Sequence, residues 1–118
     1  MTNSFKKRHT FEQRKAESTK IIQKYDERIP IIVYKDPKCT NLKEINKNKF
    51  LAPDDLTLGQ FLVVIRKRIE LTDAEALFVF VNESTLAPTS ETIGSLYNKY
   101  KDEDGFLYML YCSENVFG

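Results

Sequence analysis

The sequence lacks most of the residues on which enzymes and metal sites depend. Its 118 residues include no tryptophan, one histidine, two cysteines and four glycines. So few glycines leave no glycine-rich phosphate loop, and Cys39 and Cys112 are too far apart for a metal-ligand spacing. The single imidazole, His9, lies in a polar basic segment, whereas a hydrolytic triad needs a base beside its nucleophile. We therefore expect no catalytic residue, no metal and no cofactor.

Long apolar runs are also missing. No stretch is long enough to cross a bilayer, and the N-terminus lacks the apolar segment of a secretory signal. We expect a cytoplasmic chain whose two cysteines are reduced structural thiols. Hydrophobic residues make up 42% and charged residues 30%, a composition typical of a folded globular domain, and the length fits one domain with short appendages.

Charge is unevenly distributed along the chain. Residues 1–28 carry eight basic and four acidic side chains, whereas the remaining residues carry ten basic and thirteen acidic ones. A basic N-terminal segment suits an acidic partner, a membrane surface or nucleic acid, and a solvated helix face explains it equally well.

Capping signals predict two main helices. Thr10 with Gln13 forms a capping box that opens a helix toward Tyr25, and Thr57 with Gln60 forms another. The first helix has only a thin apolar face, so we expect it to lean on a finished domain. That face holds Phe11, Ser18, Ile22 and Tyr25, with Glu17 and Ile21 on a neighbouring strip. A short further helix is predicted over residues 4–9.

The second capped helix is the strongest in the sequence, with apolar residues at helical spacing that indicate a core face. Around it, strands are predicted over residues 29–34, 49–53, 77–81 and 106–112, and a short helix over 90–99. Pro53 places the second strand at a sheet edge or ends it there. This order predicts an α+β fold, a ubiquitin-like β-grasp with a four-stranded mixed sheet around the main helix.

Two local features bear on function. Arg66, Lys67 and Arg68 form a basic cluster that keeps a nucleic-acid-binding domain open as a weak alternative. The sequence given ends at Gly118, and a glycine without Cβ can pass through a narrow enzyme channel with its carboxylate free for activation.

Several segments together resemble the autophagy-related ubiquitin-like modifiers, the family that includes microtubule-associated protein light chain 3 and GABARAP. Their order and spacing cover nearly the whole chain. The segments are 11–18 (FEQRKAES), 28–30 (RIP), 49–51 (KFL), 53–56 (PDDL), 59–61 (GQF), 64–69 (VIRKRI), 78–82 (FVFVN), 104–108 (DGFLY) and 117–118 (FG).

The resemblance implies an N-terminal helical extension over residues 1–26, a ubiquitin-like domain over 27–112 and a flexible conjugation tail over 113–118. It further implies that Gly118 is joined to phosphatidylethanolamine, which places a lipidated pool on autophagosomal membranes. The expected partners are the activating, conjugating and processing enzymes of that pathway and cargo receptors. The catalytic cysteines would belong to those enzymes.

The resemblance also implies two pockets for a partner motif in which an aromatic residue is followed three positions later by an aliphatic one. The edge strand over residues 49–53 could pair with such a peptide. Arg28 and Arg68 would contact acidic residues that flank the motif. The aromatic pocket would comprise Glu17, Ile21, Pro30, Ile32, Lys49, Leu51 and Phe106, and the aliphatic pocket Phe50, Ala52, Pro53, Leu56, Phe61 and Val64.

The chain departs from the family pattern in three ways. Ala52 stands where the family commonly has a larger branched residue, the connection over residues 36–48 is slightly longer than in close relatives, and no residues follow the glycine. For Ile32, Leu51 and Phe61, plain core packing is the competing explanation. A ubiquitin-like interaction module that is not conjugated remains the main alternative function.

Overall fold

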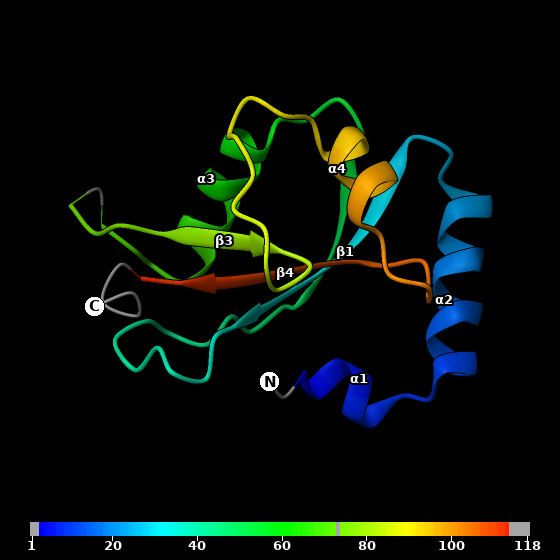
Figure 1. Ribbon diagram of the computed structural model, residues 1–118, viewed down its shortest axis with the longest axis horizontal. Helices are drawn as coiled ribbons and strands as arrows, with labels where there is room; N and C mark the ends of the chain where they lie inside the picture. Colours follow the sequence, from blue (N-terminus) through cyan, green and yellow to red (C-terminus); the bar gives the residue numbers. More distant parts are fainter. Residues whose placement is uncertain (1–2, 73, 114–118) are drawn as a thin grey trace.

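The computed structural model describes residues 3–72 and 74–113, which form four helices and four strands (Figure 1). In chain order they are α1 (Ser4–Arg8), α2 (Phe11–Lys24), β1 (Arg28–Lys35), β2 (Lys49–Pro53), α3 (Leu58–Arg68), β3 (Phe78–Val81), α4 (Ile93–Tyr100) and β4 (Leu107–Cys112).

The strands form one mixed sheet in the order β2-β1-β4-β3. β1 and β4 run parallel at the centre, and the edge strands β2 and β3 pair antiparallel with them. This topology confirms the predicted β-grasp. The predicted bounds of β2 match the structure, whereas α4 begins three residues later than predicted. Its start is fixed by Thr92, whose hydroxyl accepts the Ser95 N–H (3.2 Å) as an N-cap.

The sheet is covered on both faces, so the molecule has three layers. Because side chains alternate along a strand, Ile31 and Val33 of β1 enter the main core, while Ile32 and Tyr34 face the opposite layer. Every residue of β4 is buried, as expected for a central strand between two layers. α3 and α4 lie on the side of the main core, and α1 lies on the opposite side of the sheet (Figure 1), where Phe5 of α1 and Ile21 of α2 pack in the smaller core.

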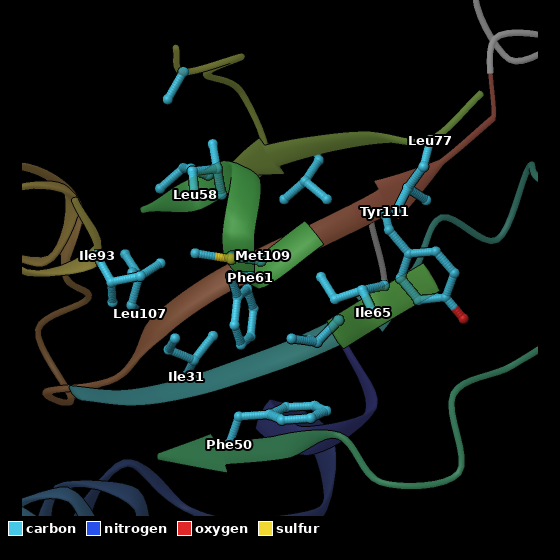
Figure 2. Packing of buried hydrophobic residues seen from close by; sticks show 14 of the residues in the cluster. Ile31, Phe50, Leu58, Phe61, Ile65, Leu77, Ile93, Leu107, Met109 and Tyr111 are labelled. Carbon is cyan, nitrogen blue, oxygen red and sulfur yellow. The ribbon is translucent and has the colours of Figure 1, made fainter. Parts of the chain in front are cut away.

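The main core is built around α3. Phe61 and Ile65 reach from this helix toward the sheet, where Ile31 and Phe50 lie (Figure 2). The predicted capping box is present, since Thr57 and Gln60 exchange hydrogen bonds of 2.9 and 3.1 Å between side chain and backbone. Both cysteines are buried and free. Within the described ranges, no helix is long and apolar enough to cross a membrane.

The N-terminal helices attach to the finished domain, as the thin apolar face of α2 predicts. Phe5 of α1 is buried, and its ring lies edge-on to that of Phe106, with centroids 5.3 Å apart. α2 does not bury an apolar face against the domain, as a typical amphipathic helix does. Phe11, Ile22 and Tyr25 stay about 40% exposed, and the one fully buried side chain of α2 is Ser18.

Candidate peptide-binding site

β2 is an edge strand, and no other strand in the described part of the chain pairs with its outer side. The Val33 N–H donates to the Asn48 carbonyl (2.7 Å), and the Asp54 N–H donates to the Glu27 carbonyl (3.0 Å). In an antiparallel ladder the hydrogen-bonded pairs recur at every second residue, so Phe50 and Ala52 supply the backbone groups that face β1. Lys49 and Leu51 therefore direct their N–H and C=O groups away from the sheet, where another strand can pair with them.

A hollow of about 650 Å³ lies beside this open edge. Ile21 of α2 and Lys49 and Leu51 of β2 all line it, so the helix and the strand both border the hollow. Three residues of the predicted aromatic pocket thus reach its surface. The complete lining is Ile21, Asn46, Lys47, Asn48, Lys49 and Leu51.

The other predicted residues of the aromatic pocket lie at the rim or beneath it. Glu17 forms an ion pair with Lys49 that links α2 to β2, and both side chains are about one-third exposed. Pro30 is buried opposite Leu51. Ile32 and Phe106 are fully buried in the smaller core, against which Ile21 packs. The hollow, together with the surface of the residues around it, is called the aromatic groove below. The residues that form this surface are Glu17, Ile21, Lys49 and Leu51.

The predicted aliphatic pocket is more closed. Phe50, Ala52 and Phe61 are buried in the main core, and the Phe50 and Phe61 rings pack edge to face at 5.6 Å. Core packing therefore accounts for Phe61. Only Val64, at 38% exposure, and the half-buried pair Pro53 and Leu56 offer surface to a partner.

Positive charge lines the open edge. Lys47 Nζ and Arg68 Cζ lie over the Phe50 ring, 5.5 and 5.9 Å from its centroid. Arg28 Nη1 lies 3.5 Å from the outward carbonyl of Leu51, a long and weak contact. An extended peptide with apolar side chains and acidic flanks would match this surface in both shape and charge.

Three lining residues were missed by the sequence analysis. Asn46, Lys47 and Asn48 end the long connection between β1 and β2, and they line the hollow. They are polar and follow no period of helix or strand, so only their position next to β2 could have suggested a role.

Neither cysteine lines this hollow. Burial raises the pKa of the Cys112 thiol to about 11, so it stays protonated at neutral pH. Among the residues that the structure describes, no group of three or more His, Cys, Asp or Glu side chains could hold a metal ion.

The predicted conjugation point, Gly118, lies outside the described residues. Ser113, the last residue that the structure describes, is buried, and its hydroxyl donates to the Asn41 side-chain carbonyl (2.9 Å).

These features define a ubiquitin-like protein that carries two N-terminal helices and an open edge strand. The same fold is found in the crystal structure of Trypanosoma brucei ATG8, which superimposes with a TM-score of 0.89 and 44% identity and covers 97% of both chains. A family model described as autophagy protein Atg8, ubiquitin-like, matches residues 13–118.

The chain belongs to this Atg8 family. Autophagy-related protein 8A of Oryza sativa is 54% identical over 115 residues, which are 98% of this chain and 95% of the relative. Autophagy-related protein 8 of Cochliobolus heterostrophus is 52% identical over 118 residues, or 100% and 98% of the two chains. The resemblance inferred from the sequence is thereby confirmed over essentially its whole length.

Proposed function

We propose that this protein is a ubiquitin-like modifier that is joined through Gly118 to phosphatidylethanolamine on autophagosomal membranes. In that position it recruits cargo receptors and autophagy factors by binding their aromatic-x-x-aliphatic motifs. The observation that best supports this peptide binding is the open edge of β2 beside the aromatic groove.

The two ends of β2 set the direction in which a motif peptide binds. The aromatic groove lies at the Lys49 end, and the surface of Pro53, Leu56 and Val64 lies at the other. A peptide whose aromatic residue precedes its aliphatic one therefore runs parallel to β2. Its backbone pairs with the outward groups of Lys49 and Leu51, while the two side chains supply selectivity.

Membership of the Atg8 family supports conjugation through the terminal glycine, because the matched region includes Gly118. The reaction needs an activated carboxylate and cysteine nucleophiles, and we assign those nucleophiles to partner enzymes. The buried Cys39 and Cys112 are unsuited to the role. The protein itself then acts as the group that is transferred and not as an enzyme.

A reconstituted conjugation reaction tests the proposal. The protein is incubated with the family's activating and conjugating enzymes, ATP and liposomes that contain phosphatidylethanolamine. We expect a lipidated product from the full chain and none after deletion of Gly118. The deletion variant should still bind a motif peptide, which shows that its fold is intact.

The same assay separates the alternatives. An interaction module that is not conjugated would bind the peptide and yield no product. The structure weakens the nucleic-acid alternative, because Arg66 donates to the carbonyls of Thr72 (3.2 Å) and Glu75 (2.8 Å) and Arg68 lies over Phe50. Binding to RNA that persists at high salt would instead support the nucleic-acid alternative.

A further inference from the structure

A buried carboxylate joins α2 to the turn before β4. Asp104 is fully buried, and its Oδ2 accepts hydrogen bonds from Arg14 Nη1 (2.7 Å) and the Tyr108 hydroxyl (2.5 Å). Its Oδ1 accepts the Phe106 N–H (2.9 Å), and its backbone carbonyl accepts the Ser18 hydroxyl (2.5 Å). One residue therefore ties two side chains of α2 to the sheet.

These polar contacts replace apolar packing on α2. Ser18 is its one fully buried residue, and Arg14 is largely buried with only 11% of its side chain exposed. The helix also approaches the backbone closely, since a Cβ on Gly105 would lie 2.3 Å from Ser18 Oγ. A buried charge that loses its partner is costly, so the cluster holds α2 in one position against the turn.

The same position shapes the aromatic groove. Glu17 precedes Ser18 directly, and Ile21 lies one turn further along the same side of α2. Phe106, whose N–H is held by Asp104, lies beneath the groove in the smaller core. Asp104 thus contacts the elements that form both the outer wall and the floor, although it lines no part of the hollow.

We propose that Asp104 is a positioning residue for the aromatic groove, acting through Arg14 and Ser18 to fix the wall that receives the aromatic side chain. The proposal rests on the peptide binding proposed above. It makes the affinity for the aromatic half of a motif depend on a buried carboxylate that never touches the peptide.

The test compares Asp104→Asn with Asp102→Asn in the full chain. Both changes remove one negative charge from the same turn, but the ion pair of Asp102 is with Lys6 of α1 (2.7 Å). Asp102 Oδ2 also accepts the Asp104 N–H (3.1 Å), a contact that the amide oxygen of Asn can keep. Calorimetry measures binding of an acidic peptide that contains Trp-x-x-Leu and of two further peptides in which the Trp or the Leu is replaced by Ala. Denaturant unfolding shows that each variant is folded.

We expect Asp104→Asn to weaken binding of the Trp-x-x-Leu peptide about tenfold, and Asp102→Asn to change it less than about twofold. The loss of affinity on replacing the peptide's Trp should shrink in Asp104→Asn, whereas the loss on replacing its Leu should stay as in the parent chain. General destabilisation would not produce this split between the two halves of the motif.

If Asp104→Asn does not fold, Ser18→Ala tests the same placement of α2 through its other contact, because it removes the hydrogen bond to the Asp104 backbone carbonyl and leaves the charge pair intact. Unchanged affinity in a folded variant, or an equal loss for both halves of the motif, would overturn the positioning role and leave the proposed function standing. Failure of the parent chain to bind any of the peptides would overturn both proposals.

Discussion

Pro30 of β1 lies opposite Leu51 of β2, in a pair of the ladder that needs no backbone hydrogen bond from either residue. The missing N–H of proline therefore leaves the β1–β2 pairing intact. At the same position the backbone groups of Leu51 point outward, so one register accommodates the proline and leaves the edge open for a partner strand.

Replacing Leu51 with Ala should weaken binding of an acidic aromatic-x-x-aliphatic peptide. Burial of apolar surface contributes about 25 cal/mol per Å², so the loss should be roughly 1 to 3 kcal/mol in calorimetry. Leu86→Ala is the matched control, because Leu86 is a leucine that is 56% exposed outside the groove. Equal affinities of the two variants would place the binding surface elsewhere.

Proline scanning of β2 should distinguish its two sides. Leu51→Pro removes an outward N–H, so we expect a folded protein that binds the peptide about 0.5 to 1.5 kcal/mol more weakly than Leu51→Ala, the net contribution of one hydrogen bond. Ala52→Pro removes an N–H that faces β1 and should instead lower the free energy of unfolding. The two quantities are measured by calorimetry and by urea denaturation. A stable Ala52→Pro beside an unfolded Leu51→Pro would reverse our assignment of the ladder.

Replacing Arg68 with Ala should weaken peptide binding less than Leu51→Ala does. Arg68 is exposed, and ion pairs of exposed side chains contribute only about 0 to 1 kcal/mol. The effect should also fade with salt, since the screening length falls to about 10 Å at 0.1 M. Binding is measured with an acidic and a neutral version of the peptide across a salt series. A loss that persists at high salt would indicate packing on Phe50 as the main role of Arg68.

The Cys112 thiol should make stability depend on alkaline pH. Burial raises its pKa from 9.0 to about 11, so the folded state holds the proton where the unfolded state releases it. Below pH 9.0, the pKa of the thiol in the unfolded chain, this group should leave the free energy of unfolding unchanged. The free energy of unfolding should then fall as pH rises from 9.0 toward about 11. Urea denaturation of the parent chain and of Cys112→Ala isolates this contribution from those of the tyrosines. Identical slopes against pH in both proteins would refute it.

The elements of the fold were predictable where local chemistry decides them. The capping box of Thr57 and Gln60 predicts the start of α3, and Pro53 predicts the end of β2. The way in which α2 docks was not predictable, because its contact joins Arg14 and Ser18 to Asp104, about ninety residues away in sequence. A polar contact between residues so far apart produces no periodic pattern of residue types in the sequence.

In the candidate site too, some features follow from the local sequence and others depend on tertiary contacts. Alternation along β2 separates Leu51 from Phe50, and in the structure Leu51 is exposed and Phe50 is buried. The role of Asn46, Lys47 and Asn48 in lining the hollow depends on how the connection folds back beside Ile21. That arrangement is set by tertiary contacts, such as the Tyr111 hydroxyl bonded to the Lys43 carbonyl (2.5 Å), which a single sequence does not reveal.

The central place of β4 has a consequence for synthesis of the protein. β4 is the last element of the described chain, yet it lies between β1 and β3 and supplies part of both cores. On the ribosome, β1 can pair with β2, but β1 and β3 lack their shared neighbour until β4 has emerged. We infer that the domain folds in a single late step after nearly all of its residues have been made, and that its nascent N-terminal helices have no finished surface to dock on before then.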